Sequence, residues 1–223
     1  MSGRLAAWLK DNYPDVKSDL FSAFIVRNSE LALQKGQLGF MSPFVWMFIS
    51  SYEKLRSFLI SHKTITSLIQ LEYSGFEGAT VPICAFTLEN AHHLNFKGAY
   101  IRLSDFRGAE NQAPKTLEAI KNHDCGWFYR AAASDFRKIP GSPIAYWVGD
   151  LWFKVFRDNP SLGGETFVSE GVKTGNNERF LRFWHEVSES DCGSLFDNNT
   201  KWVYHHKGGE YRKWAGNQEY VIL

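Results

Sequence analysis

The stretch Thr64-Ile65-Thr66-Ser67-Leu68-Ile69-Gln70-Leu71 is typical of a β-strand, because it is short, mostly apolar and rich in β-branched residues. A second strand is predicted at residues 80–88, where Pro82 favours an edge position or a bulge. Residues 38–42 are a shorter strand candidate, with one predicted helix before them and another between them and Thr64. The order helix, strand, helix, strand, strand predicts an α/β fold that is half of a doubly wound sheet.

Both predicted helices carry terminal signals. Ser18 is a candidate cap for the first helix and Gly36 a candidate stop, while Ser50 and Glu53 form a possible capping box for the second helix. Apolar side chains at helical spacing are expected to face the core: Leu20, Phe21, Phe24, Leu31, Leu55, Phe58 and Leu59.

The pattern of predicted helices and strands becomes less regular from about Asn90. A strand is predicted at residues 100–103 and a short helix at residues 114–123, with Pro114 in its first turn. Irregular, aromatic-rich segments follow. We therefore predict two regions, an α/β region over residues 1–90 and a mixed α+β region over residues 91–223.

Composition narrows the class of protein. The 223 residues suffice for one large or two small domains, and the aromatic content of 16% suits a dense core or a surface that stacks on flat ligands. The net charge is +1 without a strongly basic stripe, so any DNA affinity of this chain alone is expected to be modest. Its 3 cysteines form no C-x-x-C pair, and the sequence contains neither a signal peptide nor a long apolar run. We expect a cytoplasmic protein without a membrane partner.

Residues 171–184 combine turn formers with hydrogen-bond donors. Gly171 and Gly175 can adopt positive φ, and the segment is predicted to lead into an aromatic amphipathic helix. Its donors could contact phosphates or base edges: Lys173, Thr174, Asn176, Asn177 and Arg179. The alternative is a turn whose asparagines bond only their own backbone.

A second group of cations lies near the carboxyl end. Lys207, Arg212 and Lys213 are interleaved with Tyr204, Tyr211 and Trp214, which suits phosphate contact or base stacking. A solvated hairpin is the alternative.

Several kinds of catalytic site are missing from the sequence. No predicted strand is followed by G-x-G-x-x-G, and the run Asp158-Asn159-Pro160-Ser161 lacks the second proline and the aromatic residue of an Asn-Pro-Pro-Tyr loop. The histidine pairs at 92–93 and 205–206 are adjacent rather than three or four residues apart, so no metal site is predicted.

Taken in order, the segments of this chain resemble one family, the adenine-specific DNA methyltransferases of restriction and phage-defence systems, most closely the PglX enzymes of BREX-type systems. Six segments carry this resemblance: residues 15–27, 36–47, 50–56, 138–147, 171–184 and 201–214. The resemblance implies that residues 1–90 are the second half of a Rossmann-like methyltransferase sheet. It also implies that residues 91–223 begin a target-recognition region that is incomplete here.

The same resemblance suggests roles for individual residues. Leu20 and Phe21 would line the cofactor and base pocket, with simple core packing as the alternative. Pro43 and Trp46 would shape the loop beside the flipped base, unless Trp46 is a structural core residue. The family's cofactor-binding glycine motif and its Asn-Pro-Pro-Tyr loop do not occur here, so no catalytic residue is assigned.

The function implied is that of a fragment of an enzyme that transfers a methyl group from S-adenosyl-L-methionine to adenine N6. We expect the complete enzyme to bind this cofactor and the chain alone not to bind it. The expected partners are double-stranded DNA and the missing amino-terminal half or other defence-system subunits. The alternatives are a non-catalytic DNA-binding or protein-interaction module and an unrelated α+β protein.

Overall fold

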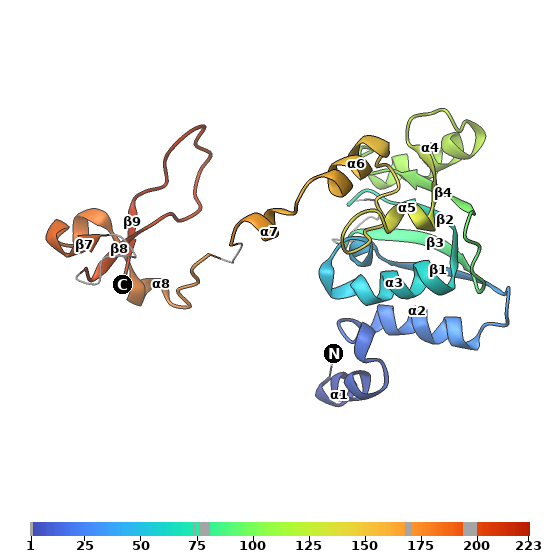
Figure 1. Cartoon of the computed structure of the whole chain (residues 1–223), viewed down its shortest axis with the longest axis horizontal. Helices are drawn as coiled ribbons and strands as arrows, with labels where there is room; N and C mark the ends of the chain where they lie inside the picture. Colours follow the sequence, from blue (N-terminus) through green and yellow to red (C-terminus); the bar gives the residue numbers. More distant parts are fainter. Residues whose placement is uncertain (1, 74, 76–80, 168–170, 194–199) are drawn as a thin grey trace. The chain divides into compact units, whose positions relative to one another are not determined.

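The structure, a computed structural model, describes residues 2–73, 75, 81–167, 171–193 and 200–223. The chain forms two compact units, Met1–Glu165 and Thr166–Leu223. Figure 1 shows the elements of both units. Residues 91–165 thus pack with the amino-terminal part of the chain. The functional division into a catalytic region before residue 91 and a target-recognition region after it stays a prediction.

The first unit is built on a five-stranded mixed sheet with the strand order β1-β3-β2-β4-β5 (Figure 1). The bounds are β1 Gln37–Pro43, β2 Thr64–Gln70, β3 Ile83–Glu89, β4 Lys97–Arg102 and β5 Phe128–Ala132. β3 is antiparallel to both β1 and β2, β4 is parallel to β2, and β5 is antiparallel to β4. The carboxyl ends of β1, β2 and β4 therefore meet at one edge of the sheet. The predicted α/β fold class is confirmed.

Helices cover both faces of this sheet. The helices and 3-10 turns of the unit are α1 Gly3–Asn12, η1 Pro14–Val16, α2 Leu20–Leu31, η2 Phe44–Met47, η3 Ser50–Tyr52, α3 Glu53–His62, α4 Ala109–Lys121, α5 Ala133–Phe136, α6 Asp150–Asp158 and α7 Leu162–Glu165. On one face Phe86 and Leu68 of the sheet share a core with Ile25 of α2 and Leu59 of α3. On the other face a smaller core includes Ala119 of α4.

The strand predictions are largely confirmed. β2 lies within the predicted residues 64–71, and β1 and β4 contain or overlap the other two predicted strands. Residue 80 lies outside the described residues, and β3 begins at Ile83. Neither alternative inferred from Pro82 is confirmed: β3 lies between β1 and β2 rather than at an edge, and the irregularity in the β2–β3 register falls between Ile65 and Ser67, away from Pro82. Pro82 precedes the strand, so its missing N–H costs no ladder bond, while its carbonyl accepts a bond from the Phe44 amide at 2.9 Å.

The predicted helix ends and faces need correction. The cap of α2 is Asp19 rather than Ser18, and α3 follows the turn η3 without a side-chain cap. Phe24 and Leu31 are 56% and 65% exposed. The residues that α2 buries instead are Ser22, Ala23, Ile25 and Ser29. This face is possible because the Ser22 and Ser29 hydroxyls donate to the carbonyls of Val16 and Ile25. α4 begins at Ala109, so Pro114 lies inside the helix and not in its first turn.

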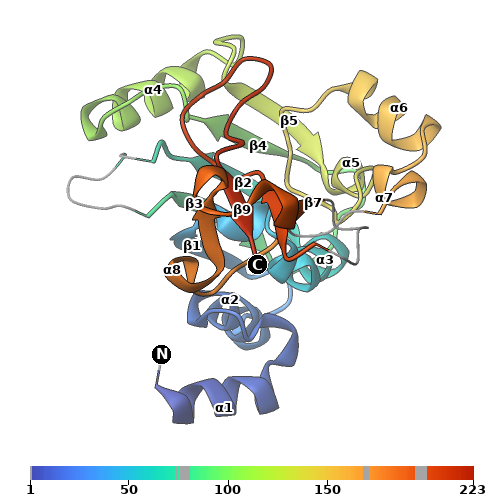
Figure 2. The ribbon, with the colours of Figure 1, turned by 90° about the vertical axis from the view of Figure 1, so that its left-hand side faces the viewer.

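The second unit contains a four-stranded sheet with the order β6-β9-β8-β7. Its elements are α8 Asn177–Phe180, β6 Leu181–Phe183, η4 Trp184–Glu186, η5 Glu189–Asp191, β7 Cys192–Gly193, β8 Trp202–His205 and β9 Tyr220–Ile222. Figure 2 shows α8, β7 and β9 of this unit. The predicted amphipathic helix is wrong: α8 has 4 residues and the chain then becomes β6, because β9 offers Leu181–Phe183 a pairing partner.

Among the described residues no helix is both long and apolar enough to cross a bilayer.

Candidate nucleic-acid interface

Donors predicted from two distant parts of the sequence meet around one groove in the second unit. The groove measures about 630 Å³, and its lining includes Lys173, Thr174, Asn177 and Lys207. His205 at the end of β8 and His206 after it also line the groove. Cations, a hydroxyl and an amide around one open groove are the groups that bind phosphates.

The turn at residues 171–177 confirms the positive φ predicted for its glycines at Gly175 but not at Gly171. Gly175 has a φ of 64°, in the left-handed region. Asn176 Oδ1 accepts a bond from the Arg179 amide at 3.0 Å and so caps α8, while the Thr174 hydroxyl pairs with Asn177 Oδ1. The side-chain oxygens of both asparagines are thus used within the turn, but Asn176 accepts from a backbone amide, as in the alternative interpretation, whereas Asn177 accepts from a side chain. Contact of these side chains with DNA stays a prediction.

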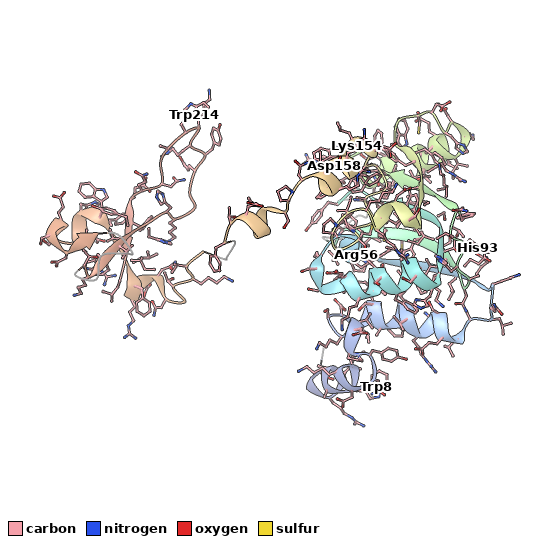
Figure 3. The ribbon with its side chains drawn as sticks, in the orientation of Figure 1. Trp8, Arg56, His93, Lys154, Asp158 and Trp214 are labelled. Atoms are coloured by element: carbon pink, nitrogen blue, oxygen red, sulfur yellow. The ribbon has the colours of Figure 1, made fainter. Side chains whose placement is uncertain are left out.

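Asn176, Arg179, Arg212 and Lys213 do not appear among the residues that line the groove. Arg179 and Lys213 lie exposed, with Arg179 against the Phe180 ring at 5.1 Å and Lys213 Nζ 5.3 Å from the Trp214 ring centroid. Trp214 itself is 89% exposed in the long connection between β8 and β9, where Figure 3 labels it. Arg212 and Lys213 are therefore interleaved with Tyr211 and Trp214 but lie apart from the groove, whereas Lys207 of the same connection lines it.

A pocket of about 490 Å³ that was not predicted from the sequence shares His205 and His206 with the groove. Its remaining lining residues are Trp184, Glu189, Cys192, Tyr204, Gln218 and Tyr220. The sequence signal for it is the density of aromatic and histidine residues in segments 183–185 and 202–206. The spacing of these residues in the sequence could not reveal the pocket, because the segments that form it come together only when β6 and β8 pair with β9.

In the first unit a polar row crosses the carboxyl edge of the sheet. Ser42 and Gln70 both pair with Cys84, and Gln70 also pairs with Arg102, so the four side chains lie on one face. The Tyr146 hydroxyl donates to Gln70 Oε1 at 2.8 Å. Ligands of open α/β sheets bind outside the carboxyl ends of the strands, which makes this edge the place to look for a substrate site.

Cys84 is not a nucleophile in this row. Burial raises the pKa of its thiol to about 12, so it stays protonated near neutral pH. Within the described residues no cluster of His, Cys, Asp or Glu could hold a metal ion.

The turn after β1 contains Pro43 and Trp46. The Trp46 ring is fully buried and lies 5.0 Å from the Phe86 ring. No described oxygen or nitrogen accepts a bond from its indole N–H, which instead interacts with the Cys84 thiol. Pro43 is half-buried at the end of β1. This geometry favours a structural Trp46, and a role for either residue beside a base stays a prediction.

Arg56, which was not predicted as important, holds this turn in place. Its side chain is only 1% exposed and donates to the carbonyls of Trp46 at 2.9 Å and Ile49 at 2.7 Å. Its Nε and second amino group both donate to the Gly141 carbonyl, at 3.0 and 2.7 Å. Figure 3 labels Arg56 on α3. The guanidinium thus joins the turn after β1 to the segment that brings Tyr146 over the polar row.

Leu20 and Phe21 are half-buried against the core. Leu20 lines a groove of about 610 Å³ between α1 and α2, together with Trp8 and Tyr13. The Phe21 ring packs 5.4 Å from the Tyr52 ring. The two residues thus have different neighbours, and their assignment to a cofactor stays a prediction.

The mixed sheet with helices on both faces places the chain in the class of α/β proteins. The family model of Eco57I restriction-modification methylases matches residues 1–76. The adenine-specific methyltransferase BrxX of Escherichia coli O9:H4 (strain HS) is 37% identical over 226 residues, which cover 100% of this chain and 18% of BrxX. The adenine-specific methyltransferase PglX of Lacticaseibacillus casei (strain Zhang) is 34% identical over 100% of this chain and 19% of PglX.

The chain is therefore similar along its whole length to adenine-specific methyltransferases, and it spans less than a fifth of the length of these two relatives. Among solved structures, the type I restriction-modification methyltransferase subunit from Streptococcus thermophilus is 17% identical with a TM-score of 0.47, over 62% of this chain and 33% of that one.

Proposed function

We propose that these residues are the segment of a site-specific adenine-N6 DNA methyltransferase that joins the end of its catalytic sheet to the start of its DNA-reading region. The observation that carries this proposal is the similarity to BrxX and PglX along the entire chain. The complete enzyme would act on cytoplasmic DNA in restriction-modification or phage defence.

The groove of the second unit is the proposed contact with double-stranded DNA. Lys173 and Lys207 supply charge for phosphates, and Thr174 and Asn177 supply shorter polar groups beside them. Arg179, Arg212 and Lys213 are exposed cations that could extend this contact along the duplex. The role of this chain would be to hold and orient the DNA.

Methyl transfer would need groups that the sequence of this chain lacks. In the complete enzyme S-adenosyl-L-methionine would supply the methyl group: its methyl carbon–sulfur bond would break to leave the thioether as the bond to adenine N6 forms, and N6 would lose a proton. In this chain Pro43 and the polar row of Ser42, Gln70 and Arg102 lie at the carboxyl ends of β1, β2 and β4, and Trp46 lies in the turn after β1. We propose that they position the extruded base, and that Leu20 and Phe21 line the cofactor and base pocket.

β1 offers a place for the other half of the sheet. It pairs with β3 on one side, and no described strand pairs with its other edge. Gln37, Gly39 and Met41 are exposed along this strand. An edge strand of 7 residues is a template for a further strand, which supports pairing with a strand from another part of the complete enzyme or from another subunit of the defence system.

The second candidate function is a protein-interaction module without catalysis. The observation that favours it is α6, whose apolar side chains stand in solvent, with Leu151 73% and Trp152 58% exposed. Figure 3 marks Lys154 and Asp158 on the same helix.

A duplex titration with increasing salt tests the proposal. The chain is expected to bind duplex DNA with an affinity that falls steeply between about 50 and about 200 mM salt, because phosphate contacts release counterions. Replacing Lys173 and Lys207 with Gln should reduce the slope of log K against log salt by about 0.9 for each lost contact. The matched control replaces Lys10 and Lys121, which are exposed in the first unit, and should leave the slope unchanged.

Failure to bind any duplex in dilute salt would refute the DNA-reading role. Calorimetry with S-adenosyl-L-methionine tests the cofactor expectation separately. We expect no binding by the chain alone, and tight binding would show that the cofactor site is already present in these residues.

A further inference from the structure

The aromatic pocket of the second unit has no role in the function proposed above. Three of its walls are rings: Trp184, Tyr204 and Tyr220. Trp184 and Tyr204 are 56% and 54% exposed, so both present ring surface to solvent. Large exposed aromatic side chains around one hollow are uncommon on a protein that has no flat ligand to bind.

The sheet holds these rings in place. Tyr220 pairs with Phe183 on one side and with His205 on the other, and its ring stacks on Phe183 at 4.9 Å. The Trp184 amide donates to the Glu219 carbonyl at 3.0 Å, which fixes the turn that carries the indole. The pocket is thus framed by the strands β7, β8 and β9 and the turns η4 and η5, with His206 and Gln218 from the two ends of the β8–β9 connection, and Trp214 is not among its lining residues.

The polar lining suits the edge of a nucleobase. Gln218 supplies an amide with both donor and acceptor atoms, Glu189 supplies acceptors, and the imidazoles of His205 and His206 can donate or accept. Side-chain amides and carboxylates are the groups that read base edges in protein–DNA complexes.

The positive charge of Lys207 favours a phosphate group beside this pocket. Lys207 Nζ lies 4.9 Å from the centroid of the Tyr220 ring, and Lys207 also lines the adjoining groove. His205 and His206 belong to both hollows. A ligand that bridges them would therefore have a flat ring next to an anion, as a nucleotide does.

We propose that this pocket takes one unstacked nucleobase of DNA whose backbone lies in the neighbouring groove. The proposal rests on the proposed function, since it requires that the second unit binds DNA. Stacking on Trp184 and Tyr204 would hold the base, and the Lys207 ammonium would hold its phosphate.

Affinity measurements with two kinds of DNA test this proposal. The probes are an intact duplex and the same duplex with one unpaired base in a single-nucleotide bulge. The bulged duplex should bind more tightly than the intact one. Trp184→Ala and Tyr204→Ala should each weaken its binding about tenfold, since an aromatic ring under a base accounts for a change of this size. The salt slope should stay the same, because no phosphate contact is lost. Trp152→Ala, an exposed tryptophan of α6, is the matched control and should have no effect.

Photocrosslinking of the wild-type chain adds a test that needs no variant. A bulged 5-iodouracil is expected to crosslink to segment 181–193 or 202–207. Equal affinity for both probes, or crosslinks that fall only on residues 208–217, would overturn the pocket. Binding of the intact duplex with a steep salt slope would then still support the proposed function, whereas loss of all DNA binding would refute both.

Discussion

Arg56 provides the sharpest test of how the turn after β1 is held. Its guanidinium makes four hydrogen bonds to three carbonyl oxygens, at 2.7 to 3.0 Å, and its side chain is almost completely buried. In Arg56→Met the side chain keeps a similar length but donates nothing. The carbonyls of Trp46, Ile49 and Gly141 would each lose a charged donor, although the Ile49 carbonyl would keep its bond from the Tyr52 amide at 3.1 Å. A buried group left without a partner costs about 1–3 kcal/mol.

Because water can reach part of the new gap, we expect a total loss of about 4 kcal/mol in the free energy of unfolding of the first unit. Arg56→Lys keeps the charge but cannot span three carbonyls, so it should lose about half as much. The matched control is Arg137→Met, since exposed Arg137 makes one bond, to the Ser61 hydroxyl at 2.8 Å, and should change stability by about 0.5 kcal/mol or less.

The assay is hydrogen exchange of peptides from the first unit, read by mass spectrometry across a urea series. This readout separates the first unit from the second, which a whole-chain signal would not do. In Arg56→Met, protection should fall most in peptides that contain residues 44–49 and 141–147. If Arg56→Met lies within about 1 kcal/mol of Arg137→Met, the three-carbonyl contact does not stabilise this turn, and the reasoning fails.

Four further results are expected. Gly98→Ala should destabilise the first unit by about 1–3 kcal/mol, since an added Cβ would lie 2.5 Å from the Ile65 carbonyl oxygen. The control is Gly39→Ala, where the space around the added Cβ is open. Equal melting temperatures for the two variants would contradict the expected clash at Gly98. A thiol reagent near pH 8 should modify half-buried Cys125 and Cys192 in the folded chain but Cys84 only after unfolding, because burial raises the Cys84 pKa to about 12. Rapid labelling of Cys84 in the folded chain would contradict this burial. Burial also raises the pKa values of Tyr100 and Tyr146 above that of an unfolded tyrosine, so the folded state binds more protons than the unfolded state above pH 10. The free energy of unfolding should therefore decline there by up to about 1.4 kcal/mol per pH unit for each residue. A free energy of unfolding that stays constant through this range in urea titrations would contradict the burial of both hydroxyls. Asn176→Ser keeps an acceptor for the α8 cap and should retain stability, whereas Asn176→Ala should lose about 1 kcal/mol; DNA affinity that drops equally in both would instead assign the amide to DNA contact.

The strands were predictable because their signal is local. The β-branched run at residues 64–71 needs burial on both faces, and β2 receives it from the two cores. The helix faces were less predictable. α2 buries Ser22 and Ser29, whose hydroxyls bond within the fold, and leaves Phe24 exposed, and hydrophobic spacing cannot anticipate this arrangement.

The amphipathic pattern after Gly175 failed for a different reason. Leu181–Phe183 has β9 as a partner some 40 residues later, and the pairing outweighs the local preference. The same long-range pairing brings Lys173 and Lys207 to one groove and builds the pocket around Trp184 and Tyr220. Residue types indicated the donors, but only the sheet shows which of them act together. Arg56 was missed because three backbone carbonyls, which carry no sequence signature, are its partners.

The most direct measurement of the central claim is adenine methylation by a chimera in which these residues replace the matching segment of E. coli BrxX. The account predicts N6-methyladenine in target DNA. It also predicts that Lys173→Gln with Lys207→Gln lowers kcat/KM for DNA and leaves the affinity for S-adenosyl-L-methionine unchanged. Undiminished methylation with both lysines replaced, or a chimera that binds cofactor and DNA yet methylates nothing, would contradict it.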